Sequence, residues 1–147
     1  MSSDKLSPSN QAGMILLAHG SRDPLWRQPI EAVLLALQAS QPDLPCTCAY
    51  LEACVPDLST AANALIAQGV NRLTVLPLFL GTGKHAREDI PRLLNELRLQ
   101  HPDCQFDLQT AAGENPRVTA LLAQLAVEAI AHQSGDSGSN IQNSDKK

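Results

Sequence analysis

Two histidines and a glutamate stand where the chain could carry out acid–base and metal chemistry. His19 and His85 each follow an apolar run, and Glu52 follows another apolar run between them. A neutral imidazole accepts protons near neutral pH and binds divalent metals, and a carboxylate can assist it as acid or base. This set of side chains favours a borderline ion such as cobalt, nickel, iron or zinc. The remaining histidines, His101 and His132, fall near predicted helix ends and are interpreted as structural or solvated.

The segments that must position these residues alternate between short apolar runs and amphipathic stretches. Strands are expected at 14–18, 46–51, 72–80 and 105–110, and helices over 25–41, from Pro56 to about 68, from about Glu88 to Gln100, and from Pro116 to near His132. This order predicts a single-domain α/β fold, a three-layer αβα sandwich around a four-stranded parallel sheet of flavodoxin-like architecture. Ligands of such sheets bind beyond the carboxyl ends of the strands, where His19, Glu52 and His85 would all lie.

The composition limits both the size of the domain and the class of its partners. Residues 1–12 and 133–147 are mostly polar or small, so we expect disordered ends and one folded domain over 13–132. The formal net charge of −4 argues against general nucleic-acid binding, which needs a basic face. There is neither a membrane-length apolar run nor an export signal, so a cytosolic location is expected.

The cysteines do not form a recognisable metal or redox motif. Cys46 and Cys48 lie on one face of a predicted strand, Cys54 follows closely, and Cys104 is separate. A structural zinc site would pair C-x-x-C units at set spacing, and that pattern is absent. Reduced thiols that behave as small apolar residues are the expected state.

The G-T-G-K-H stretch at 81–85 offers a competing interpretation as a phosphate-binding loop. Leu78 stands where the first glycine of that motif should be, and His85 stands where Ser or Thr would hold magnesium. Arg22, Lys84 and Arg87 nevertheless make this rim locally basic, which suits an anionic ligand or a solvated surface.

Three segments together resemble the motifs of one known family. The segments are H-G-S-R-D-P at 19–24, Y-L-E-A-C-V-P-D-L at 50–58 and V-L-P-L-F-L-G-T-G-K-H-A-R-E-D-I-P at 75–91. They resemble, in the right order, those of the short CbiX-type sirohydrochlorin chelatases of class II, and the resemblance covers roughly Met14 to Ile130. It implies a chelatase-like fold and ATP-independent insertion of cobalt, ferrous iron or nickel into sirohydrochlorin or a related tetrapyrrole, in siroheme or cobalamin biosynthesis.

The resemblance also implies roles for individual residues. His19 and His85 match the family histidines that hold the metal and help remove pyrrole protons, and Glu52 matches an assisting acidic residue. The metal ion would be a substrate, and no organic cofactor is implied. The substrate would be bound by residues of the same rim: Ser21, Arg22, Gly83, Lys84 and Arg87.

The implied partners are the tetrapyrrole and a second copy of the chain, because short family members look like homodimers with the pocket between subunits. Neither nucleic acid nor a membrane is expected as a partner. Asn115 departs from the family pattern, because relatives often carry a histidine in this turn. The sequence therefore does not support a third histidine at the site.

Two other functions stay open at this point, because a fold alone does not determine function. One is a carrier of the same fold that holds a metal or a finished tetrapyrrole without catalysis. The other is a flavodoxin-like protein that binds phosphate or a nucleotide.

Overall fold

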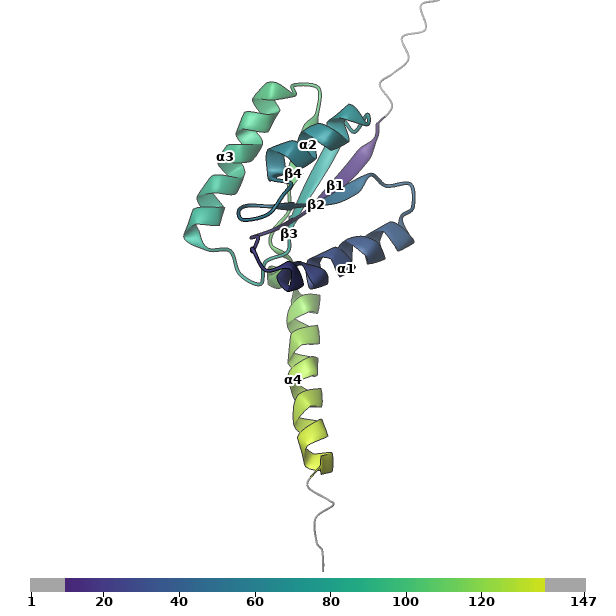
Figure 1. The fold of residues 1–147 in the computed structure, drawn as a ribbon, viewed down its shortest axis with the longest axis vertical. Helices are drawn as coiled ribbons and strands as arrows, with labels where there is room; N and C mark the ends of the chain where they lie inside the picture. Colours follow the sequence, from purple (N-terminus) through teal and green to yellow (C-terminus); the bar gives the residue numbers. More distant parts are fainter. Residues whose placement is uncertain (1–9, 137–147) are drawn as a thin grey trace, which may run out of the picture.

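The structure, a computed structural model, describes residues 10–136 and contains a four-stranded parallel sheet (Figure 1). The elements in chain order are β1 (Ala12–Ala18), α1 (Pro24–Ser40), β2 (Cys46–Tyr50), α2 (Leu58–Ala67), β3 (Arg72–Pro77), α3 (Lys84–Gln100), β4 (Gln105–Leu108), the 3-10 turn η1 (Ala112–Glu114) and α4 (Pro116–Asp136). The strand order is β2-β1-β3-β4, and every neighbouring pair is parallel. The predicted α/β fold is confirmed.

The sheet is covered by different helices on its two faces. Alternate residues of the central strand β1 point to opposite sides, so Ile15 and Leu17 join the core under α2 and α3. Leu16 and Ala18 join a smaller cluster under α1. Burial on both faces explains why β1 reads as a continuous apolar run. In Figure 1 the strands lie between α1 and α2.

Helix α3 begins at Lys84, four residues before the expected start near Glu88. Gly83 is its N-cap, with extended backbone and no side-chain capping bond, so the usual start signal is missing. The buried stripe of α3 begins already at Ala86 and continues through Ile90, which draws the preceding residues into the first helical turn. His85 therefore lies in a helix rather than in a loop.

The other boundaries differ from the predicted ones by a few residues. β3 ends at Pro77 rather than at position 80, since its last pair with β1 joins Pro77 to Leu17. The ordered elements extend past the predicted domain limits, because β1 starts at Ala12 and α4 runs to Asp136. The disorder predicted for residues 1–9 and 137–147 lies outside the described residues.

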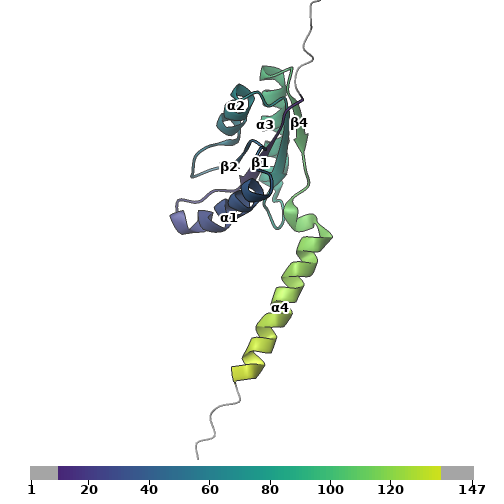
Figure 2. The ribbon, with the colours of Figure 1, turned by 90° about the vertical axis from the view of Figure 1, so that its right-hand side faces the viewer.

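Helix α4 leaves the sheet instead of covering it (Figures 1 and 2). Its packing neighbour is the short turn η1, from which it starts. Within residues 10–136, none of the helices combines the length and hydropathy that a membrane span requires.

Candidate functional site

A cavity of about 500 Å³ opens at the carboxyl edge of the sheet, where the sequence places its candidate residues. Its volume lies in the range of small-molecule sites. The residues that line it come from the ends of β1 and β2 and from the first turns of α3: His19, Leu51, Glu52, Gly83, Lys84, His85, Ala86, Asp89, Arg92 and Leu93. The predicted catalytic residues His19, Glu52 and His85 thus share one cavity.

A glycine allows the segments after β1 and β2 to lie against each other. The Glu52 backbone N–H donates a hydrogen bond to the His19 carbonyl at 2.9 Å. Gly20 follows with a φ of +102°, and a Cβ there would stand 1.7 Å from the Glu52 carbonyl oxygen. Any other residue at position 20 would push the two segments apart, so Gly20 keeps His19 beside Glu52.

The His19 ring is oriented by an aromatic neighbour. It stacks on Phe79 with 4.1 Å between ring centroids and 21° between ring planes. Phe79 is only 4% exposed, and its carbonyl accepts a hydrogen bond from the Gly113 N–H at 2.8 Å. Stacking on a buried ring restricts the plane of the imidazole at the position where His19 lines the cavity.

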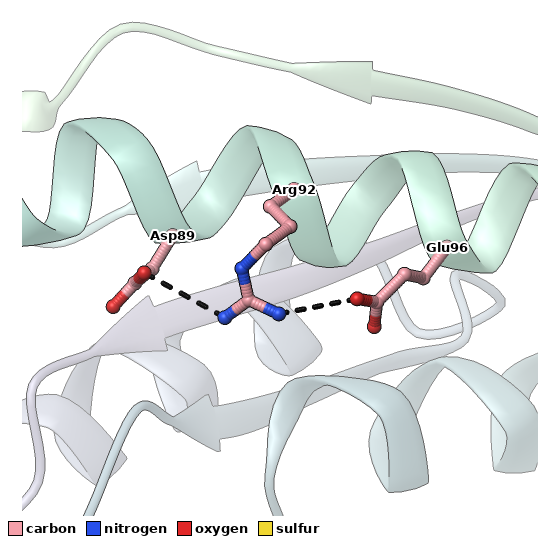
Figure 3. Close-up of polar contacts among 3 residues, drawn as sticks. All are labelled: Asp89, Arg92 and Glu96. Carbon is pink, nitrogen blue, oxygen red and sulfur yellow. Dashed lines mark hydrogen bonds and ion pairs between the residues drawn. The ribbon is translucent and has the colours of Figure 1, made fainter.

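The cavity wall formed by α3 carries a row of polar residues at helical spacing. His85, Asp89 and Arg92 stand at positions i, i+4 and i+7, which share one face of a helix. Arg92 Nη2 lies 3.6 Å from Asp89 Oδ1, and Arg92 Nη1 lies 3.1 Å from Glu96 Oε1 (Figure 3). The three side chains are 53–58% exposed, so these ion pairs are weak and Arg92 can exchange its partners at little cost.

The charges around the cavity are mixed in sign. Lys84 and Arg92 oppose Glu52 and Asp89, and the free N–H groups of the first turn of α3 add positive potential beside His85. This arrangement can bind an anionic ligand through Lys84 and Arg92 in the cavity that His19 and His85 also line.

Comparison of the sequence with known proteins shows the family of the chain. The family model described as CbiX matches residues 13–129, which is most of the described chain. The chain belongs to the CbiX family. A sirohydrochlorin cobaltochelatase of Saccharolobus islandicus (strain L.S.2.15 / Lassen #1) is 38% identical over 100 residues, covering 65% of this chain and 77% of that protein.

Solved structures of CbiX and SirB proteins share the fold. A putative cobalamin biosynthesis CbiX protein from Marinobacter aquaeolei VT8 has a TM-score of 0.71 at 31% identity, covering 85% of this chain and 99% of that one. SirB from Bacillus subtilis with Fe3+ has a TM-score of 0.67 at 26% identity, covering 90% of this chain. The sirohydrochlorin chelatase SirB from Bacillus subtilis subspecies spizizenii with cobalt has a TM-score of 0.68 at 25% identity, covering 86% of this chain. This chain spans 50% of each SirB chain.

The predicted substrate-binding residues of this CbiX chain do not all line the histidine cavity. Gly83 and Lys84 line the cavity with the histidines. Arg87 lies instead in a neighbouring cavity of about 370 Å³, together with Thr82 and Glu114. The early start of α3 explains this, because two helical residues after His85 the side chain points to the opposite face.

Ser21 and Arg22 do not reach the cavity in the described chain. The Ser21 hydroxyl accepts a hydrogen bond from the Asp23 N–H at 3.1 Å, next to the cap of α1. The Ser21 backbone also contacts Cys54 Sγ, at 3.3 Å from both its N and its O. Arg22 is exposed on the same loop. Their predicted role in substrate binding stays a prediction.

Two cavity residues were missed by the sequence reasoning. Asp89 and Arg92 lie beyond the assumed loop, in a segment interpreted only as helix. Their spacing from His85 was the available signal, but it predicts a shared face only once His85 itself is helical.

The four cysteines, all within residues 10–136, are free in the structure. Burial raises the pKa of the Cys48 and Cys104 thiols above their ordinary value, which keeps them protonated. Among residues 10–136, no three His, Cys, Asp or Glu side chains are grouped so that they could hold a metal ion.

Proposed function

We propose that this CbiX-family chain is a sirohydrochlorin chelatase, which inserts a divalent metal ion into sirohydrochlorin or a closely related tetrapyrrole without ATP. The observation that carries the proposal is the shared cavity of His19, Glu52 and His85 at the carboxyl edge of the sheet. The similarity to a protein named sirohydrochlorin cobaltochelatase and to SirB structures with iron and cobalt supports it.

The reaction exchanges two protons for one metal ion. The free tetrapyrrole gives up its two pyrrole N–H protons, the metal sheds water, and the products are the metallated ring and two protons. His19 and His85 suit this exchange because a neutral imidazole can either ligate the incoming metal or accept a departing proton. Glu52, beside His19, can pass a proton on to solvent.

The substrate carries several carboxylates, and the α3 wall offers cationic groups to bind them. Lys84 lies in the first turn of α3, and Arg92 lies two turns further along the same wall. The exposed ion pairs of Arg92 can be replaced by a substrate carboxylate, which gives Arg92 the role that the sequence had assigned to Arg87.

Cobalt and ferrous iron are the proposed metals, and nickel is a further candidate. Imidazole and carboxylate ligands bind all three metals. The choice among them therefore depends on the coordination geometry of the site and on which metal is available in the cell. The place of the product in siroheme or cobalamin synthesis and a cytosolic location are part of the same proposal.

We also propose that the working form is a homodimer. One chain matches half of a SirB chain, so two chains would supply the same number of domains. The cavity on a single chain is open to solvent, and a second subunit would provide the wall that a large planar ring needs.

An anaerobic absorbance assay tests the chelatase function. The purified protein is mixed with sirohydrochlorin and, separately, with cobalt, ferrous iron and nickel, and each rate is compared with the uncatalysed rate. We expect catalysis that falls by about 10²-fold or more in His19→Ala and in His85→Ala, because each variant loses a metal ligand or base. His101→Ala, at the opposite end of α3, is the matched control and should keep its activity.

Normal turnover in soluble, folded His19→Ala and His85→Ala would exclude the proposed roles of the histidines. Tight tetrapyrrole binding without acceleration by any of the metals would identify a carrier of the same fold instead.

A further inference from the structure

A second cavity opens at the carboxyl edge of the sheet, on the other flank of α3 from the cavity of His19 and His85. Its volume is about 370 Å³, and we call it the Arg87 cavity. Ala86 lines both cavities, so the first turn of α3 forms the wall between them. The flanks differ because His85 and Arg87 are two helical residues apart, which places their side chains about 200° apart around the helix axis.

The Arg87 cavity has the composition of a small-molecule site. Residues of β3, α3 and β4, which include Pro77, Ile90 and Leu108, give it an apolar wall. The polar residues that line it are Thr82, Arg87, Gln109, Thr110 and Glu114. The hydroxyl, amide and guanidinium groups of this set can all donate hydrogen bonds, which suits a ligand that carries a carboxylate.

Arg87 is available to such a ligand. Within residues 10–136 both ion pairs belong to Arg92, so Arg87 forms none, not even with Glu114 of the same cavity. An exposed guanidinium that has no protein carboxylate as a partner can bind a ligand carboxylate through two parallel hydrogen bonds. Glu114 carries the opposite charge and would repel the same carboxylate.

The turn that leads into α3 leaves open space beside both cavities. A Cβ added to Gly81 or to Gly83 would have no other part of the chain within 4 Å. Neither has a positive φ, because the glycines with positive φ in the described chain are Gly20 and Gly69. Packing and backbone conformation therefore do not require glycine at these two positions. Glycine also allows a ligand to approach the backbone closely, and Leu80, which precedes Gly81, adds a side chain that is 70% exposed.

The proposed substrate is too broad for the histidine cavity alone. A tetrapyrrole carries carboxylate side chains around its whole ring, whereas Lys84 and Arg92 both line the histidine cavity. An α-helix with its side chains is about 10 Å across, which is less than the width of such a ring with its side chains. A ring that reaches His85 over the first turn of α3 therefore extends to the other flank of the helix.

We propose that the tetrapyrrole lies across the N-terminal end of α3, with its centre at the histidine cavity and the carboxylates of its far side in the Arg87 cavity. One face of the ring covers the open turn at Gly81 and Gly83. The free N–H groups in the first turn of α3 add positive potential between the two cavities. This inference rests on the proposed function, and it makes Arg87 a specificity-determining residue for tetrapyrroles with carboxylates on that side.

The first test is the affinity of the full-length protein for metal-free sirohydrochlorin, measured by anaerobic absorbance titration without added metal. We expect Arg87→Ala to weaken binding roughly three- to fivefold, as the loss of one exposed charge pair does, and Arg87→Lys to restore part of the loss. Glu114→Gln should tighten binding, because it removes the repulsion of the carboxylate. Arg72→Ala, at the far end of β3, is the matched control and should bind normally.

The second test fills the open turn. Gly81→Leu should weaken binding about tenfold or more, since its side chain occupies the space given to the ring. Its thermal midpoint should stay equal or rise slightly, because the position has room and the unfolded chain loses freedom. Gln100→Leu, at the opposite end of α3, adds the same side chain and should bind normally.

A third measurement separates the two flanks of α3. If Arg87 and Arg92 bind different carboxylates of one ring, the losses of affinity in Arg87→Ala and Arg92→Ala multiply in the double variant. A double variant no weaker than the weaker single variant would mean that both arginines contact the same carboxylate, which overturns the proposal.

The outcomes separate this inference from the chelatase function. Normal affinity in Arg87→Ala, in a protein that still inserts metal, would overturn the position of the ring and leave the function intact. The expected changes of affinity in a protein that inserts no metal would support the position and contradict the function. A chain that binds no tetrapyrrole would contradict both. If Gly81→Leu does not fold, the Arg87 and Glu114 variants decide the question alone.

Discussion

At the scale of single residues, the cavity depends on side chains that orient the histidines as much as on the histidines themselves. Phe79 supports the His19 ring at 4.1 Å, and Gly20 keeps His19 next to Glu52. Neither residue carries chemistry of its own. In the proposed reaction His19 binds the metal and then releases it, and stacking on Phe79 would hold the plane of its ring without a further hydrogen bond.

Arg92 should determine the affinity for the tetrapyrrole. We expect Arg92→Ala to raise KM for sirohydrochlorin roughly fivefold, about 1 kcal/mol, with little change in kcat, because an exposed charge contributes binding but no chemistry. Steady-state kinetics at saturating metal measures both constants. Arg72→Ala, an exposed arginine at the far end of β3, serves as the charge-matched control. A fall in kcat with unchanged KM would contradict a binding role.

Tyr50 is the single tyrosine of the chain and should titrate late. Burial raises its pKa to about 12, against about 10 for a free tyrosine. The unfolded chain loses this proton first, so the contribution of Tyr50 to stability is present below pH about 10 and declines as the pH rises toward 12. Ultraviolet absorbance of the phenolate, in native buffer and in urea, measures both midpoints. Identical midpoints in the two solvents would show that Tyr50 is not buried in solution.

At the scale of elements, the start of a helix decides which residues enter the cavity. Because α3 begins at Lys84, His85 faces the cavity together with Asp89 and Arg92, while Arg87 points to the neighbouring cavity. A start four residues later would have left His85 in a loop and its orientation unspecified. Because the segment is helical, residues spaced four and three positions apart, His85, Asp89 and Arg92, lie on one face and form a wall of the cavity.

Helix α2 begins close to the same site and depends on one cap. Asp57 Oδ1 accepts the Thr60 N–H at 2.8 Å, and the hydrogen bonds from the Thr60 side chain and backbone lower the pKa of Asp57. We expect Asp57→Ala to reduce the free energy of unfolding by about 0.5–1 kcal/mol at pH 7, at the low end for a cap because the side chain is exposed.

The pH dependence of this cap has a definite sign. Its contribution is present above the unfolded carboxyl pKa of about 3.9 and is lost as the pH falls through the lower folded pKa. Urea denaturation at pH 7 and in acid measures the difference. Asp57→Asn, which can still cap, should lose less stability than Asp57→Ala, and an equal loss at both pH values would contradict the charged cap.

At the scale of the whole molecule, activity should follow assembly. If two chains form the working cleft, the chelatase rate per chain falls on dilution below the dissociation constant of the dimer. The rate is measured over a dilution series whose mass is followed by light scattering. A constant rate per chain across the range in which the protein becomes monomeric would show that one open cavity is sufficient.

The sequence alone determined the order of strands and helices and the residues that carry chemistry. Continuous apolar runs, caps such as Asp23 and the spacing of three motifs are local properties, so they can be read without coordinates. The parallel sheet then follows, and with it the meeting of His19, Glu52 and His85 at one edge.

Only the tertiary structure decided which neighbours those residues have. The stacking of Phe79 on His19, the exclusion of any larger residue at Gly20 and the direction of α4 each arise between segments far apart in the chain. The start of α3 belongs to the same class, because burial of Ala86 against the core, rather than a capping side chain, extends the helix to Lys84. Local patterns predict which side chains share an element, whereas packing between elements decides which of them face the same cavity.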